Sequence, residues 1–241
     1  MPRKPRMYLS GVPCHVIQRG NNREACFFAQ QDYLFYLSCL GDACYRYHVA
    51  VHAYVLMTNH VHLLMTPEDR EGISRVMQSV GRRYVQYINK KYQRCGTLWE
   101  SRHKASLVDA ERYLLTCYRY IELNPVAANM VTHPVNYTWS SYRHNVFGET
   151  NPVITHHDLY RRLGVTEEER RCQYRALFSA MLAKEDIHTI QSAARFSMPV
   201  GDGRFKTQIE RALGFSIGQA KRGRPFCESR EEGGSDENKN H

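Results

Sequence analysis

Two apolar runs rich in β-branched residues, only two positions apart, constrain the fold of this chain more than any other feature. The runs occupy residues 49–57 and 60–65, and Thr58-Asn59 joins them. A two-residue connection between such runs is typical of a β-hairpin. Side chains alternate between the two sides of a strand, so His60 and His62 point the same way. The sequence therefore predicts a rigid hairpin that presents two parallel imidazoles.

Two neutral imidazoles held in parallel on one strand can bind a single divalent cation with little loss of conformational entropy. The chain has 12 histidines, however, so a pair at this spacing also arises by chance. The bland interpretation is two half-exposed histidines on a sheet. For the pair alone, this structural interpretation is favoured.

A second segment, residues 109–125, predicts a helix. It begins with a good N-cap residue and ends at a proline, which we expect to push Asn124 out of helical geometry. The spacing places Tyr113, Cys117, Tyr120 and Asn124 along one face of this helix. If that face packs on the hairpin, Asn124 can give an oxygen to a metal while Tyr120 presents its hydroxyl to a phosphate.

Two other residues of this helix compete for a role. Tyr113 is the rival nucleophile, but Asn124 lies only one turn from Tyr120, which favours Tyr120. Glu122 points about 200° away from Tyr120 at 100° per residue, so we expect it to make a structural hydrogen bond or ion pair.

The remaining elements give the order of secondary structure. We expect a strand at 14–18, a helix at 31–47, a helix at 71–92 and a strand at 104–108 around the hairpin, followed by the tyrosine helix. The order β-α-β-β-α-β is the split βαβ arrangement of ferredoxin-like sheets. The expected fold class is therefore α+β.

The chain divides into three parts on its sequence pattern. Residues 1–150 form the expected catalytic domain, and 151–220 a mostly helical appendage with helices at 152–164, 166–184, 186–196 and 204–213. Residues 221–241 form a basic stretch and a polar tail that we expect to be disordered. Arg222 and Arg224 lie in an R-G-R-P run similar to the AT-hook core, which binds the DNA minor groove; a merely basic tail explains it equally well.

Charge favours an anionic partner. The chain has 33 Lys and Arg against 24 Asp and Glu, a formal net charge of +9, so nucleic acid comes before an anionic membrane. No apolar run approaches the roughly 20 residues of a membrane helix. The eight cysteines show no C-x-x-C pairing, which indicates reduced thiols. We expect a cytoplasmic protein without membrane contact.

Basic residues also follow the predicted helix at 71–92. Arg75, Arg82 and Lys90 lie opposite its apolar stripe and face outward. A charged outer face is usual for an amphipathic helix, but a near-absence of acidic residues is not. We therefore expect this row to bind DNA phosphates.

Several motifs in a fixed order resemble those of one family. They are the H-V-H strand at 60–62, Y-I-E-L-N-P at 120–125, G-T-L-W-E at 96–100, K-A-S-L-V at 104–108 and W-S-S-Y at 139–142. Together, from about residue 12 to 142, they resemble the REP-associated tyrosine transposases, which belong to the single-tyrosine HUH endonucleases.

The resemblance implies specific roles. His60 and His62 match the metal ligands and Tyr120 the nucleophile. Asn124 matches a polar third ligand that is glutamine in related insertion-sequence transposases. The implied activity is metal-dependent cleavage and rejoining of single-stranded DNA through a 5′-phosphotyrosine, at hairpin-forming repeated palindromic elements. Imidazole suits zinc, whereas phosphoryl chemistry and the family favour magnesium or manganese.

Two other functions stay open on the sequence. A non-catalytic nucleic-acid-binding regulatory protein needs only the basic helix and tail. A zinc-dependent hydrolase of a small substrate uses the histidine pair but needs neither Tyr120 nor the positive charge. The sequence also leaves open whether the protein is a monomer or a homodimer.

Overall fold

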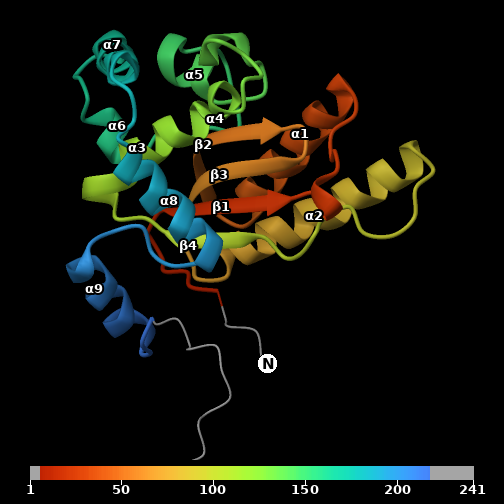
Figure 1. Ribbon diagram of the computed structural model, residues 1–241, viewed down its shortest axis with the longest axis horizontal. Helices are drawn as coiled ribbons and strands as arrows, with labels where there is room; N and C mark the ends of the chain where they lie inside the picture. The colour runs from red at the N-terminus through yellow and green to blue at the C-terminus, as the bar shows by residue number, and fades with distance from the viewer. Residues whose placement is uncertain (1–5, 218–241) are drawn as a thin grey trace, which may run out of the picture.

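A four-stranded antiparallel sheet lies at the centre of the fold (Figure 1). The computed structural model describes residues 6–217. The strands are β1 (Cys14–Arg19), β2 (Val49–Met57), β3 (His60–Pro67) and β4 (Lys104–Leu107), in the spatial order β2-β3-β1-β4. The hairpin is formed as predicted, with Met57 opposite His60. The ferredoxin-like order of elements is confirmed, with strand and helix ends moved by only one or two residues.

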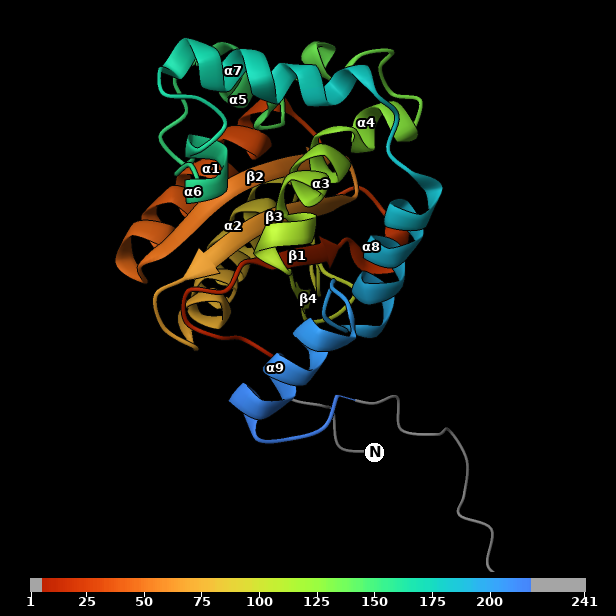
Figure 2. The same ribbon diagram turned by 90° about the vertical axis from the view of Figure 1, so that its left-hand side faces the viewer.

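Helices cover both faces of the sheet. α1 (Gln30–Arg46) and α2 (Gly72–Lys91) lie side by side on one face, whereas α3 (Ala110–Glu122) and α8 (Lys184–Phe196) lie on the other (Figures 1 and 2). Val61 and Leu63 of β3 are buried in the core under α1 and α2, and Leu64 is buried in the core under α3. Because faces alternate along a strand, His60 and His62 point toward α3.

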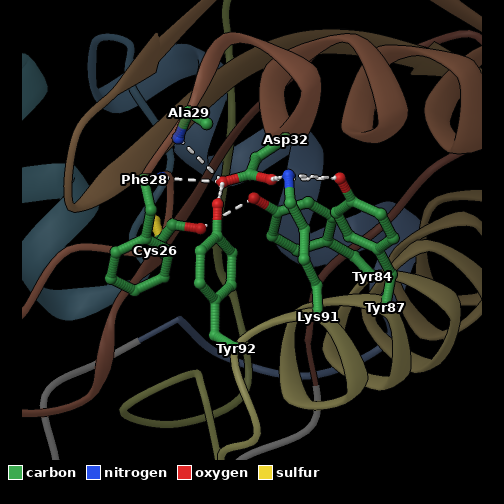
Figure 3. Close-up of polar contacts among 8 residues, drawn as sticks. All are labelled: Cys26, Phe28, Ala29, Asp32, Tyr84, Tyr87, Lys91 and Tyr92. Atoms are coloured by element: carbon green, nitrogen blue, oxygen red, sulfur yellow. Dashed lines mark hydrogen bonds and ion pairs between the residues drawn. The ribbon is translucent and has the colours of Figure 1, made fainter.

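A buried carboxylate locks α1 to α2 (Figure 3). Asp32, in the first turn of α1, accepts a hydrogen bond from Lys91 Nζ at 2.7 Å at the end of α2. Burial alone would raise the pKa of Asp32, but hydrogen bonds from Lys91 and from backbone amides hold that pKa below its usual value. The other donors to Asp32 are the amides of Phe28 and Ala29 and the hydroxyls of Tyr87 and Tyr92.

The end of α3 differs from the prediction. Asp109 occupies the N-cap position, but its side chain makes no capping hydrogen bond. Asn124 is not pushed out of helical geometry, because it begins a further one-turn helix, α4 (Asn124–Ala127). Pro125 lies in the first turn of α4, where a helix has no use for the missing N–H. The proline thus starts a helix instead of only ending one.

Glu122 is completely buried and ties α3 to two later helices. Its carboxylate accepts hydrogen bonds from Ser141 Oγ at 2.5 Å, Asn145 Nδ2 at 2.7 Å and the Tyr174 hydroxyl at 2.8 Å. Asn145 belongs to α5 (Tyr142–Phe147) and Tyr174 to α7 (Glu167–Ala176). These are the structural hydrogen bonds expected of Glu122.

The C-terminal part is helical, but the expected helix over 152–164 is wrong. Only α6 (Asp158–Arg161) forms there, because Ile154 pairs with Val51 at the edge of β2 instead. The expected helix over 166–184 stops at Ala176 in α7 and continues as one 3₁₀ turn. The last described helix is α9 (Gly203–Leu213); the short 3₁₀ turns are Asn21–Arg23, Pro134–Asn136 and Leu177–Ser179.

Helices α6, α7 and α8 share a core with α3. Tyr160, Tyr174 and Ile190 belong to the same buried cluster as Leu114 and Ile121 of α3. The division of the chain at residue 150 stays a prediction. Arg222, Arg224 and the rest of residues 221–241 lie outside the described residues. Within residues 6–217, every helix is too short or too polar to pass through a bilayer, and seven cysteines are free thiols.

Candidate active site

A hollow of about 470 Å³ opens at the end of the sheet where β1 stops and β3 begins. All four residues predicted for the site, His60, His62, Tyr120 and Asn124, line this hollow. Tyr113, the rival nucleophile, does not line it. The helix spacing and the strand alternation therefore converge on one place in the fold.

Ring positions bring the predicted groups into close range. The ring centroids of His60 and His62 are 5.0 Å apart, and those of His62 and Tyr120 are 5.9 Å apart. Asn124 Nδ2 donates to the Tyr120 carbonyl oxygen at 3.0 Å, one turn back along the helix. This bond orients the amide of Asn124.

A third histidine, His15 of β1, lies beneath the pair. It is 1% exposed, and its Nε2 is 2.8 Å from His62 Nδ1. For His62 Nε2 to bind a metal, the ring proton has to sit on Nδ1, from which it is donated to His15. The bond from His60 Nδ1 to Asn59 Oδ1, at 2.6 Å, likewise leaves His60 Nε2 as the acceptor nitrogen. The bond to Asn59 thus favours the tautomer of His60 that ligates through Nε2, and the contact with His15 allows the same tautomer of His62.

Burial keeps these imidazoles neutral. It lowers the pKa of His15 and of His60 to about 4, and lowers that of His62 well below its usual value. A neutral imidazole has the lone pair that a metal ion requires. The ring pair is therefore in the ligating state at neutral pH without a proton being removed.

The environment of Tyr120 favours the protonated phenol. Burial raises the pKa of Tyr120, while hydrogen bonds to Gln191 and Asn124 and the charge of Arg19 act in the opposite direction. The phenol on its own is therefore a weak nucleophile. A cation beside it would shift this balance toward phenolate.

Helix α8 contributes a wall of the hollow that the sequence did not reveal. Gln191, Ala194 and Arg195 line it beside Tyr120. The apolar periodicity of 186–196 predicted a helix but contained no information on where it packs. No sequence motif marks Gln191 as a site residue.

Positive charge surrounds the hollow. Arg19, Arg102, Lys104 and Arg195 line it, against a single acidic residue, Glu100. Among the described residues none of these four cations forms an ion pair. Unpaired cations around a concave site attract a phosphodiester backbone.

The predicted basic row lies elsewhere. Arg75, Arg82 and Lys90 are exposed on α2, on the opposite face of the sheet from Tyr120 (Figures 1 and 2). Arg75 also pairs with Glu71 one turn earlier on the same helix. The structure therefore does not bring this row together with the hollow, and its role in DNA binding stays a prediction.

The donor set suits one divalent cation. Within residues 6–217 no group of three His, Cys, Asp or Glu side chains is placed to hold a metal ion. The third predicted ligand is the amide of Asn124, which belongs to none of these residue types. Two neutral imidazoles and one amide oxygen leave coordination positions for substrate oxygens and water. This set fits an ion that takes part in chemistry better than a closed structural site.

The geometry defines a class of site: a tyrosine beside two strand histidines, on a ferredoxin-like sheet with a cationic rim. Residues 8–124 match the family model of IS200-like transposases. This segment of the chain is therefore a transposase domain of the IS200-like family, and the protein is a DNA-processing enzyme. No curated protein matches the sequence.

One solved structure agrees on the fold. A REP-associated tyrosine transposase bound to a REP hairpin matches with a TM-score of 0.54 and 17% identity, over 65% of this chain and 93% of that one. A candidate transposase from Deinococcus radiodurans matches with a TM-score of 0.35 and 20% identity, over 49% of this chain and 96% of that one. At 17% identity the first likeness concerns the fold alone.

Proposed function

We propose that this protein cuts and rejoins single-stranded DNA, with Tyr120 as the nucleophile and a divalent cation as cofactor. One observation carries the proposal: Tyr120 lies in the same cationic hollow as His60, His62 and Asn124 of its own chain. A non-catalytic DNA-binding protein would need the cations but not this grouping.

The chemistry conserves the energy of the phosphodiester. The Tyr120 oxygen attacks phosphorus and loses its proton to solvent, while the bond from phosphorus to O3′ breaks and O3′ takes up a proton. The products are a 5′-phosphotyrosine and a free 3′-hydroxyl. A 3′-hydroxyl can then attack the phosphotyrosine and release Tyr120, so strands are joined without a nucleotide cofactor.

The residues of the hollow have distinct tasks. Gln191 and Asn124 line the hollow beside Tyr120 and would orient its side chain, and Arg19, Arg102 and Lys104 would neutralise the phosphates on either side of the cleaved bond. His60, His62 and Asn124 would hold magnesium or manganese, which polarises a non-bridging phosphate oxygen and favours ionisation of a nearby phenol. His15 would keep His62 in the ligating tautomer.

Tyr120 and the histidines of one chain already make a complete set of catalytic groups. We therefore propose that a single subunit is sufficient for cleavage. The structural relative bound to a REP hairpin supports a hairpin-forming palindromic repeat as the DNA substrate, with cleavage in adjacent single-stranded DNA.

A denaturing gel of the protein with labelled single-stranded DNA and manganese tests the nucleophile. We expect a covalent adduct with the wild type and none with Tyr120→Phe, which removes one oxygen and no charge and so leaves DNA affinity nearly intact. Tyr113→Phe is the matched control, because Tyr113 lies on the same helix face as Tyr120 but two turns away. This variant should keep the adduct. An adduct with Tyr120→Phe that is lost with Tyr113→Phe would overturn the assignment.

The same gel tests the metal ligands. His60→Ala and His62→Ala should each abolish manganese-dependent adduct formation, and Asn124→Ala should weaken it less, because an amide oxygen is a weaker ligand. Full activity of either histidine variant at limiting manganese would place the metal elsewhere. DNA binding without any adduct under these conditions would favour the non-catalytic regulatory protein.

A further inference from the structure

A second hollow, of about 560 Å³, lies directly beside the active site. Four segments of the chain form it: Arg6 and Met7 near the start, residues 101–104 at the entry to β4, residues 196–198 at the end of α8, and residues 215–217 after α9. A cavity of this volume is in the range in which proteins bind small organic groups. Apart from Arg102 and Lys104, its lining has no part in the function proposed above.

Two aromatic rings in this hollow are exposed. Phe196 at the end of α8 is 49% exposed, and Phe215 after α9 is 43% exposed. The guanidinium of Arg195 lies 5.3 Å from the centre of the Phe196 ring. Large aromatic side chains are usually buried, so two exposed rings in one concave place indicate a ligand with a flat, apolar face.

The charge of the hollow limits the class of ligand further. Arg6, Arg102 and Lys104 line it, and no Asp or Glu does. Within residues 6–217 none of these three cations forms an ion pair. A ligand that suits both the rings and the cations has a flat ring and a negative charge. A nucleotide has both, as a base and a phosphate.

The two hollows are neighbours. Ser101, Arg102 and Lys104 line the aromatic hollow and also the hollow that contains Tyr120. A strand whose phosphate lies at Tyr120 can therefore extend along this cationic segment into the aromatic hollow. An unconnected small-molecule site would not need to share its cations with the active site.

We propose that the aromatic hollow binds one unpaired nucleobase of the same DNA strand that Tyr120 attacks. The base stacks on Phe196 and Phe215, and Arg102 and Lys104 hold the phosphates between the two hollows. This step rests on the proposed function for the identity of the strand. It assigns the C-terminal helices a part in holding single-stranded DNA, which neither their periodicity nor the active-site residues indicate.

Two probes separate base stacking from phosphate contact: a labelled oligothymidylate and an abasic oligonucleotide of equal length. Affinity is measured in EDTA, so that no cleavage occurs, with the full-length protein. The Phe196→Ala/Phe215→Ala variant should bind oligothymidylate about 5- to 160-fold more weakly than the wild type, the range for loss of one stacked base. Its affinity for the abasic strand, which has phosphates but no base, should stay unchanged.

Phe147→Ala is the matched control. Phe147 is 45% exposed on α5 and lines neither hollow, so this variant should bind both probes like the wild type. Thermal unfolding of each variant checks the fold. The single variant Phe215→Ala, which changes a residue outside any helix, replaces the double variant if the latter unfolds early.

Other outcomes overturn the inference. An equal loss on both probes would show an effect on the fold or on phosphate contact, and no loss would show that the rings do not meet DNA. A gain in affinity would show that the protein's own chain occupies the hollow. The adduct assay tests the proposed function independently. If the wild type forms an adduct but the phenylalanine variant binds oligothymidylate normally, only the proposed function stands. If the variant loses affinity for oligothymidylate alone and the wild type forms no adduct, the base site stands on a non-catalytic protein.

Discussion

Replacing Glu122 by glutamine should change how the stability of this protein depends on pH. The carboxyl is completely buried among three neutral hydrogen-bond donors, Ser141, Asn145 and Tyr174, and no cation pairs with it among the described residues. Burial raises the pKa of Glu122 to about 7, although these hydrogen bonds act in the opposite direction. Glu122 is therefore protonated in the folded protein below neutral pH.

The size of the effect follows from the two pKa values. In the unfolded chain the pKa of Glu122 returns to its ordinary 4.5. The folded state therefore binds a proton between pH 4.5 and 7 that the unfolded state has already released. The stabilising contribution is complete below pH 4.5 and is lost as the pH rises through 7. At about 1.36 kcal/mol per pKa unit, the loss is about 3 kcal/mol.

Chemical unfolding in urea, followed by circular dichroism at a series of pH values from 4.5 to 8, measures this loss. Buried histidines such as His15 and His52 have lowered pKa values and give the opposite trend, so the wild type is compared with Glu122→Gln at each pH. The free energy of unfolding of the wild type relative to that of Glu122→Gln should fall by about 3 kcal/mol from pH 4.5 to pH 8. Glu168→Gln, at an exposed position of α7, should show no such change. A constant difference between wild type and Glu122→Gln would refute a protonated Glu122.

Three further predictions concern the site, the core and the outer surface. His15→Phe removes the acceptor for the His62 ring proton and should raise the manganese concentration for half-maximal adduct formation about 10- to 100-fold; an unchanged requirement contradicts a positioning role. Asp32→Asn removes the charge of a buried carboxylate whose partner Lys91 is partly exposed, and should lower the free energy of unfolding in urea by about 1 to 3 kcal/mol, whereas an unaltered value would mean that α1 and α2 hold together without it. Alanine at Arg75, Arg82 and Lys90 together should flatten log K against log salt by roughly 0.7 to 0.9 per phosphate contact, with little change in sequence preference; an unchanged slope would make this face only a solvated helix surface.

Local patterns were sufficient to predict which side chains meet at the candidate site. The alternation along β3 placed His60 and His62 on one side, and the helix spacing placed Tyr120 one turn from Asn124. Both rules depend on residues that are close in sequence. The same kind of rule predicted the hairpin and the order of strands and helices.

Pairings between distant segments could not be predicted in the same way. His15 reaches His62 only because β1 lies between β3 and β4, and sequence periodicity does not give strand order. Gln191 reaches Tyr120 because of how α8 packs, which its apolar stripe leaves undetermined. The expected helix over 152–164 failed because pairing with β2 outweighs local helix propensity around Ile154. Asn124 began a helix because a proline in the first turn is favourable there.

The position of α8 also sets when the hollow around Tyr120 is closed during synthesis. His15, His62 and Tyr120 all leave the ribosome well before Gln191 and Arg195, which form the far wall of the same hollow. A nascent chain with a folded sheet therefore has its tyrosine and histidines in place while the site is still open to water on one side. The candidate site is therefore fully formed only when nearly all of the described chain has been made.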